Sequence, residues 1–141
     1  MITAYDAPTA RLAETAGIDW ILGGDSVATV LLGFDSTLPF KMDDMIRHAQ
    51  AVRRGAPTAF VIGDMPYMTY QQSVETAIRN AGRFMAEAAT DAIKLEGGAV
   101  NAELVQGLVH AGIPVMGHIG LTPQSFHQLG GFKVQGRDVG G

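Results

Sequence analysis

The stretch Ala92-Ile93-Lys94-Leu95-Glu96-Gly97-Gly98 decides the fold of this chain. Its apolar run, Ala92 to Leu95, predicts a buried strand that ends at a carboxylate followed by two glycines. Lys94 and Glu96 lie two residues apart, so their side chains point to the same face of that strand. A buried lysine is costly unless it meets an anion. Lys94 therefore has two interpretations: a structural ion pair with Glu96, or a cation that binds a substrate carboxylate beside a metal ligand.

The same pattern occurs on both sides of this stretch, where short apolar runs alternate with longer segments of helical period. The predicted strands are Ile2–Tyr5, Ile18–Leu22, Thr58–Ile62, Ala92–Leu95 and Ile113–Met116. The predicted helices are a segment from Pro8 to Ala16, Met42–Arg54, Ser73–Ala88 and Ala102–His110. The last of these is expected to turn Leu104, Val105, Leu108 and Val109 inward. Such alternation is typical of parallel strands joined by right-handed helical crossovers.

A doubly wound sheet and a (β/α)₈ barrel both fit this alternation. The first strand–helix turn carries no G-x-G-x-x-G motif and the chain has no Walker A sequence, which weakens the nucleotide-binding sheet. Barrel strands instead carry functional residues at their carboxyl ends, on several strands at once. We therefore expect an α/β fold of the TIM-barrel type. A barrel takes about 200–250 residues, so residues 1–141 are expected to form a single domain with about the first five βα units, its C-terminal half missing.

Polar residues follow four successive strands: Asp25, Asp64, Glu96 and His118. Taken singly, a carboxylate after a strand is usually a helix cap or a solvated loop residue. Carboxylates after three adjacent strands would converge at one mouth of the barrel, where their mutual repulsion favours a bound cation. Carboxylate oxygens without Cys or clustered His favour Mg²⁺ or Mn²⁺ over zinc. The pattern predicts a divalent-metal site formed by Asp25, Asp64 and Glu96.

The other polar residues are weaker candidates for a functional role. Ser26 lies in a Gly-Gly-Asp-Ser turn, where it either caps a helix or contacts a ligand. His118 is either a hydrogen-bonded structural histidine or part of the site. His48 and His110 lie on predicted helices and are expected at the surface, whereas His127 lies in a loop with no identifiable partner.

The composition excludes several classes of protein. The chain has no cysteine, which excludes a disulfide framework and a thiolate metal site. No apolar run reaches the roughly 18 residues of a membrane span, and the first residues do not resemble a signal peptide. The net charge is −4 and the one basic doublet, Arg53-Arg54, is interpreted as a solvated helix end, so nucleic-acid binding is disfavoured. A soluble cytoplasmic protein is expected.

Eight short motifs follow one another along the whole chain. They are Thr3-Ala4-Tyr5-Asp6, Gly24-Asp25-Ser26, Asp35-Ser36-Thr37-Leu38-Pro39, Arg53-Arg54-Gly55-Ala56-Pro57, Asp64-Met65-Pro66, Lys94-Leu95-Glu96-Gly97-Gly98, Gly117-His118-Ile119-Gly120-Leu121-Thr122-Pro123-Gln124 and Gly130-Gly131-Phe132-Lys133-Val134-Gln135-Gly136. Any one of these motifs is modest evidence for a protein family, but the whole set in this order is highly specific. It resembles the ketopantoate hydroxymethyltransferases, also called 3-methyl-2-oxobutanoate hydroxymethyltransferases, of pantothenate biosynthesis.

The resemblance implies a (β/α)₈ barrel of the phosphoenolpyruvate mutase/isocitrate lyase superfamily. It also implies a reaction, in which a one-carbon unit passes from the co-substrate 5,10-methylenetetrahydrofolate to 3-methyl-2-oxobutanoate. Mg²⁺ would stabilise the enolate that attacks the methylene group, and hydrolysis would give ketopantoate. The family tends toward large homo-oligomers, so a homo-oligomer is expected.

The resemblance assigns roles to residues of this chain. Those that resemble the metal site are Asp25, Asp64 and Glu96, with Glu96 acting directly or through a water molecule. Those that resemble the keto-acid contacts are Asp25, Ser26, Asp64 and Lys94. His118 resembles a histidine that lines the same pocket, which gives Lys94 and His118 supporting catalytic roles.

The chain departs from the family at one important point. The family's general base is a glutamate beyond the Gly-Phe-Lys-Val-Gln-Gly segment, in a second half that this chain lacks. The chain alone is therefore expected to be inactive. Two other interpretations stay open: another carbon–carbon lyase or mutase of the superfamily acting on a related 2-oxo acid, or a non-catalytic half-barrel. The half-barrel would only bind metal or assemble with other chains, because five strands leave an open sheet edge.

Overall fold

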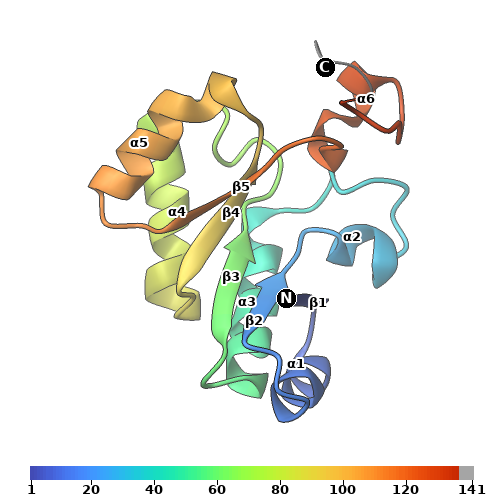
Figure 1. Ribbon diagram of the computed structural model, residues 1–141, viewed down its shortest axis with the longest axis vertical. Helices are drawn as coiled ribbons and strands as arrows, with labels where there is room; N and C mark the ends of the chain where they lie inside the picture. The colour runs from blue at the N-terminus through green and yellow to red at the C-terminus, as the bar shows by residue number, and fades with distance from the viewer. Residues whose placement is uncertain (137–141) are drawn as a thin grey trace.

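Five parallel strands form the centre of the chain (Figure 1). The structure, a computed structural model, describes residues 1–136. The strands are β1 (Ile2–Ala4), β2 (Trp20–Gly23), β3 (Phe60–Asp64), β4 (Ala92–Glu96) and β5 (Val115–His118). The main helices are α1 (Ala7–Thr15), α3 (Met42–Gly55), α4 (Val74–Ala88) and α5 (Ala102–His110). The shorter helical turns are α2 (Val27–Val30), η1 (Ala99–Asn101), η2 (Pro123–Ser125) and α6 (Phe126–Leu129).

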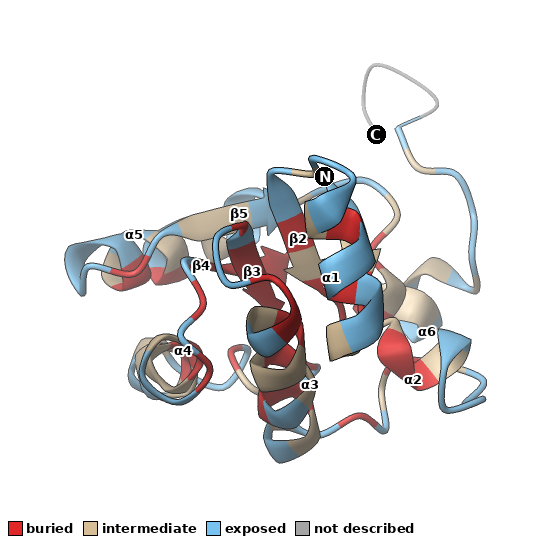
Figure 2. Cartoon of the chain, turned by 90° about the horizontal axis from the view of Figure 1, so that it is seen from below, coloured by how far each residue is buried: buried red, intermediate tan, exposed pale blue. Residues whose placement is uncertain are grey.

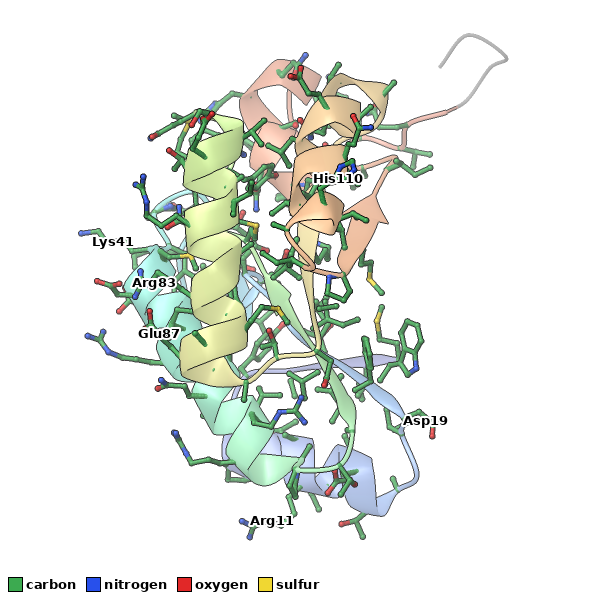
Figure 3. All side chains as sticks on the ribbon, turned by 90° about the vertical axis from the view of Figure 1, so that its left-hand side faces the viewer. Arg11, Asp19, Lys41, Arg83, Glu87 and His110 are labelled. Atoms are coloured by element: carbon green, nitrogen blue, oxygen red, sulfur yellow. The ribbon has the colours of Figure 1, made fainter. Side chains whose placement is uncertain are left out.

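The order of the strands separates the two architectures that the sequence allowed. In a doubly wound sheet the order reverses at a switch point, whereas here each strand pairs with the next one along the chain. Right-handed crossovers between sequential neighbours place the helices on one side of the sheet. Accordingly, α1 packs on α3, α3 on α4 and α4 on α5, and Figure 3 shows this helical side in front of the strands. The predicted α/β class, with the winding of a barrel, is confirmed.

The side chains of each strand alternate between a helix-covered face and an inner face. Ile21 and Val61 are fully buried in a core with residues of α1 and α3. Ile93 and Leu95 are fully buried in a second core with residues of α4 and α5. Figure 2 shows the buried residues in red where the helices and the strands face each other. The intervening positions of β4, which include Lys94, therefore point to the inner face.

The inner face changes character along the strands. At their amino-terminal ends, Trp20 and Phe60 are 47% and 36% exposed, and their ring centroids lie 5.1 Å apart. Together with Ile62, Met116 and neighbouring residues they line an apolar cavity of about 380 Å³. At their carboxyl ends the strands carry charged side chains instead. The wall that a closed barrel would enclose is thus apolar at one end and charged at the other.

Capping residues explain where the helices begin. The Asp6 carboxylate accepts a hydrogen bond from the N–H of Thr9 at the start of α1, and Pro8 lies in the first turn. The Ser73 hydroxyl accepts from the N–H of Thr76 at the start of α4. Each cap satisfies a first-turn N–H that has no acceptor within the helix. The predicted starts of these two helices are confirmed.

Some local predictions were wrong. Strands β3, β4 and β5 extend to Asp64, Glu96 and His118, so these polar residues end their strands rather than follow them. Val109 was expected to face inward but is 58% exposed, because α5 packs through Leu104 and Leu108. The short turns α2, η1, η2 and α6 were not predicted, since segments of three or four residues are too short to show a helical period.

Two residues that were expected to be solvated instead join separate elements. Arg53 Nε donates to the Ala89 carbonyl at 2.8 Å, Nη1 donates to the Ala59 carbonyl at 2.9 Å, and Nη2 pairs with the Asp91 carboxylate. His48 is partly buried, with Nδ1 2.7 Å from the Tyr5 carbonyl oxygen. The interpretation of Arg53 as a solvated residue was therefore wrong: its side chain connects the end of α3 to the segments before β3 and β4.

None of the helices within residues 1–136 is long and apolar enough to cross a membrane. The last motif, Gly130 to Gly136, falls at the end of the described residues.

Replacing Gly55 with alanine is expected to destabilise the chain. Gly55 ends α3 against α1, and a Cβ there would lie 2.2 Å from the Ala7 carbonyl oxygen and 2.9 Å from the Ala10 Cβ. Backbone atoms cannot rotate away, so α1 must shift, at a cost of about 1–3 kcal/mol. Urea unfolding of Gly55→Ala against wild type measures this cost.

Gly82→Ala is the matched control, because Gly82 lies within α4 and a Cβ there would meet nothing within 4 Å. It is expected to raise the free energy of unfolding by about 1 kcal/mol through helix propensity. Similar changes in both variants would contradict the close packing of α1 on α3.

Candidate active site

Three buried carboxylates lie at the carboxyl ends of neighbouring strands. Asp25 follows β2 by two residues, Asp64 ends β3 and Glu96 ends β4. Their exposed fractions are 3%, 2% and 5%. The backbone N–H of Asp25 donates to Asp64 Oδ2 at 3.2 Å. The structure thus gathers the carboxylates that were expected to meet at one mouth of the barrel.

Lys94 is the cation of this group. Its Nζ donates to Asp64 Oδ1 at 2.8 Å and lies 3.8 Å from Glu96 Oε1. Lys94 stands opposite Asp64 in the register of β3 and β4, so both side chains leave the inner face at the same level. The pair that was considered between Lys94 and Glu96 is therefore the longer contact. One ammonium faces three carboxylates, which leaves a surplus of negative charge when all of them are ionised.

Burial controls the ionisation of this group. Desolvation raises the pKa of Asp64 to about 7, although the charge of Lys94 opposes the rise, and the charge of Asp25 adds to it. Desolvation also raises the pKa of Glu96, against the opposing effects of the Gln124 N–H and of Lys94. Additional positive charge would favour the ionised form of both carboxyls.

Ser26 and His118 lie at the edge of the group. Ser26 Oγ lies 2.9 Å from the Tyr5 hydroxyl. Ser26 precedes α2 without a side-chain capping bond, so the helix-cap interpretation was wrong. His118 Nδ1 is buried 3.3 Å from Glu96 Oε1 but is not aligned for a hydrogen bond, and within the described part of the chain it has no partner.

Gln124 is a site residue to which the sequence assigned no role. Its side-chain amide donates to Asp25 Oδ2 at 2.9 Å, and its backbone N–H donates to Glu96 Oε2 at 2.9 Å. It lies in η2, a single turn without periodicity, and Asp25 is 99 residues away along the chain. Its place at the end of the motif that begins at Gly117 was the one available signal.

Tyr70 is a second residue without a sequence signal. It lies between β3 and α4 and is 1% exposed. Its hydroxyl donates to Gln124 Oε1 at 2.7 Å and accepts from the Glu96 N–H at 3.1 Å. Burial raises the pKa of Tyr70, so the hydroxyl stays protonated and remains a donor.

A cavity of about 380 Å³ adjoins this group. Its lining includes Tyr67, Tyr70, Glu96, Asn101 and His127, so aromatic, amide and imidazole groups share it with one of the carboxylates. A small polar molecule can therefore reach the neighbourhood of Glu96.

The donor set suits a hard divalent cation by its chemistry. Carboxylate oxygens are the ligands that Mg²⁺ and Mn²⁺ prefer, and a cation would balance the surplus of negative charge when the carboxyls are ionised. Among residues 1–136, however, no three Asp, Glu or His side chains already stand at metal-ligand spacing. Asp64 is committed to Lys94 and to the Asp25 N–H. Asp25 and Asp64 are the adjacent pair that could hold an ion, with Glu96 beyond Lys94, and the metal site stays a prediction.

Comparison with known families matches almost the entire chain. The family model described as ketopantoate hydroxymethyltransferase matches residues 1–140. The chain is 61% identical over 138 residues to 3-methyl-2-oxobutanoate hydroxymethyltransferase of Alkaliphilus metalliredigens, covering 98% of the chain and 49% of the relative. It is 57% identical over 137 residues to the enzyme of the same name from Pseudothermotoga lettingae, covering 97% and 52%. The chain therefore spans about half the length of the curated relatives it matches.

Solved structures of other enzymes share the fold. The chain matches 2,3-dimethylmalate lyase, a PEP mutase/isocitrate lyase superfamily member, with a TM-score of 0.62 at 19% identity, over 82% of this chain and 45% of that one. It matches phosphonopyruvate hydrolase, in complex with oxalate and Mg²⁺, with a TM-score of 0.63 at 18% identity, over 78% and 40%. The five sequential βα units thus correspond to part of the TIM barrel of this superfamily. With its sequence matched from residue 1 to residue 140, the chain belongs to the ketopantoate hydroxymethyltransferase family.

Proposed function

We propose that this chain supplies the metal-binding and keto-acid-binding half of a ketopantoate hydroxymethyltransferase active site. The reaction would transfer a hydroxymethyl group from 5,10-methylenetetrahydrofolate to 3-methyl-2-oxobutanoate and give ketopantoate. Family membership supports the reaction. The observation that carries the site is Lys94 held between Asp64 and Glu96. Buried charges are costly for stability, so a group with more carboxylates than cations is better explained by a ligand.

Asp25, Asp64 and Glu96 would hold one Mg²⁺ ion. When bound, the ion would supply Lewis-acid stabilisation of the negative charge on the 2-oxo oxygen of the keto acid. Burial raises the pKa of Asp64 and of Glu96, and the charge of Asp25 adds to both rises, so a bound cation would favour the ionised form of both carboxyls. Phosphonopyruvate hydrolase, which has a similar fold, binds Mg²⁺ together with oxalate, a small dicarboxylate.

Lys94 is proposed to meet the negative charge of the keto acid itself. A fixed ammonium in a water-poor site stabilises charge that develops on a substrate oxygen, and it needs no reorganisation at that moment. Ser26, whose hydroxyl lies beside that of Tyr5, would donate to a substrate oxygen. His118, which lies opposite Glu96 in the register of β4 and β5, would line the same pocket.

The proton on C3 of the keto acid requires a base from another part of the protein. The carboxylates gathered here are needed for the cation, and the chain spans only about half of its relatives. The remaining half is proposed to supply the base, and the 141-residue chain alone is proposed to be inactive. A cytoplasmic homo-oligomer belongs to the same proposal.

The exposed inner face supports a second candidate role, assembly with another chain. Trp20 and Phe60 expose aromatic surface on the side that a closed barrel encloses, and contiguous apolar surface of this kind marks an interaction site. Size-exclusion chromatography of the chain with and without Mg²⁺ is expected to show an assembly larger than a monomer. A compact monomer without metal would count against this role.

The enzymatic proposal is tested in a hybrid that joins this chain to the C-terminal half of the Alkaliphilus metalliredigens relative, half of which the chain matches at 61% identity. The hybrid is expected to form ketopantoate from 3-methyl-2-oxobutanoate and methylenetetrahydrofolate in the presence of Mg²⁺. Asp64→Asn and Lys94→Ala should each lower kcat/KM by about 100-fold or more, because Asp64→Asn removes a proposed ligand of Mg²⁺ and Lys94→Ala removes the ammonium that faces the reacting oxygen.

Asp19→Asn and Lys41→Ala are the matched controls, since both residues are exposed and Figure 3 shows their side chains pointing outward from the molecule. They should leave kcat/KM within about twofold of the unmodified hybrid. Oxaloacetate and phosphonopyruvate serve as competing substrates. Turnover of either one, without ketopantoate formation, would favour the lyase or mutase alternative.

The stability of the metal-free chain is expected to fall as pH rises from about 4 through about 7. Asp64 has an ordinary pKa of 3.8 that the fold raises to about 7, so the folded state favours the protonated form. This contribution is fully present below the unfolded pKa and is lost as pH rises through the folded pKa. The free energy of unfolding in urea, measured at pH 5 and pH 8, reports the change.

Asp64→Asn does not titrate at this position, so the decline between pH 5 and pH 8 should be smaller than in wild type. Asp19→Asn should keep the wild-type decline, because Asp19 is exposed. If wild type and Asp64→Asn lose stability equally over this interval, Asp64 does not carry the pH dependence.

A further inference from the structure

Gln124 occupies an unusual place for an amide side chain. It is 6% exposed, in the η2 turn that follows β5. Neither helix periodicity nor strand pairing accounts for its burial, and a buried amide is stable only when its polar atoms find partners.

Every hydrogen-bonding position of this amide is used. Nε2 donates to Asp25 Oδ2 at 2.9 Å and to the Met65 carbonyl at 2.8 Å. Oε1 accepts from the Tyr70 hydroxyl at 2.7 Å and from Gln71 Nε2 at 3.2 Å. An amide offers two donors and two acceptor positions, so the side chain is fully satisfied and held in one orientation.

The orientation is fixed by the chemistry of the partners. The Met65 carbonyl can only accept, so the NH₂ group must face it, and the same group donates to Asp25 Oδ2. Tyr70 donates to the other end. A reversed amide would place Oε1 against the Asp25 carboxylate, with oxygen facing oxygen. The hydrogen bond from the Tyr70 hydroxyl to Oε1 therefore helps to hold the Gln124 amide in this orientation, and Tyr70 is called its lock below.

The backbone of the same residue holds a second carboxylate. The Gln124 N–H donates to Glu96 Oε2 at 2.9 Å, while the Tyr70 hydroxyl accepts from the Glu96 N–H at 3.1 Å. One residue thus fixes one oxygen of Asp25, which follows β2, and one oxygen of Glu96, which ends β4. The other oxygen of Glu96 stays directed toward Lys94 and His118.

We propose that Gln124 is a positioning residue for the divalent-metal site, with Tyr70 as its lock; the inference rests on the proposed function. Gln124 holds Oδ2 of Asp25 and Oε2 of Glu96, which leaves the other oxygen of Asp25 for the cation and Glu96 Oε1 directed toward Lys94 and His118. Groups that orient ligands in this way typically change metal affinity by about 10–100-fold when they are removed.

The test is Mn²⁺ binding to the 141-residue chain, followed by the loss of the six-line EPR signal of free Mn²⁺. Gln124→Met keeps the side-chain length and removes both donors, and it is expected to raise the Kd for Mn²⁺ by about 10–100-fold. Tyr70→Phe keeps Gln124 but unlocks its amide, and a smaller increase is expected. The double variant should bind about as weakly as Gln124→Met alone, because the two residues act through one contact.

The number of Mn²⁺ ions bound per chain distinguishes a positioning role of Gln124 from a role in folding. A variant that is partly unfolded binds fewer ions per chain, whereas a mispositioned ligand weakens the Kd at an unchanged number of sites. Gln128→Met, an exposed substitution in the adjoining α6, is the control and should bind as wild type.

The outcomes distinguish the two proposals. If the wild-type chain binds Mn²⁺ and Gln124→Met binds it with the same Kd, the positioning role is overturned and the proposed function stands. A lower number of sites at an unchanged Kd likewise assigns Gln124 to folding alone. A wild-type chain that binds no Mn²⁺ at millimolar concentration overturns the metal site of the proposed function, and the positioning role falls with it.

Discussion

The ion pair between Lys94 and Asp64 is the interaction on which the charged edge of the sheet depends. Both residues are nearly buried, at 8% and 2% exposed. Loss of either partner would leave the other charge uncompensated, which typically costs about 3–5 kcal/mol. Their meeting is set by the register that places Asp64 opposite Lys94. A slip of one residue would turn one of them toward the helices. The register of β3 and β4 therefore also determines whether this ion pair can form.

The helical layer supports the same register from the other face. Gly63 precedes Asp64 in β3, and a Cβ at Gly63 would lie 2.3 Å from the ring of Phe84 in α4. The absence of a side chain lets α4 lie close to the strand at the level of the site. Gly63 therefore allows close packing on the outer face, and the next residue, Asp64, places its charge on the inner face, as the alternation of a strand requires.

The sequence predicted the features that repeat along it. Apolar runs that end in polar residues located the strands, and the spacing of Lys94 and Glu96 placed both on one face. The closest partner of Lys94 could not be predicted, because it depends on pairing between strands 30 residues apart. Gln124 and Tyr70 come from segments without periodicity, so no pattern pointed to their burial. Arg53 resembled a solvated charge because its partners are mostly backbone carbonyls, which leave no mark in a sequence.

The direction from which each carboxylate is held decides where a ligand can approach. Gln124, in the turn after β5, donates hydrogen bonds to Asp25 Oδ2 and Glu96 Oε2. Glu96 Oε1 instead faces Lys94 and His118 on the inner side. Protein donors thus fill the loop side and leave lone pairs and an ammonium directed inward. A ligand of Lys94 would then approach from the inner face, above the apolar wall that includes Trp20, while the cavity lined by Tyr70 leads to Glu96 from the other side. Further chain that covered this wall would exclude water from the charged end as well, and each electrostatic contact there would become stronger.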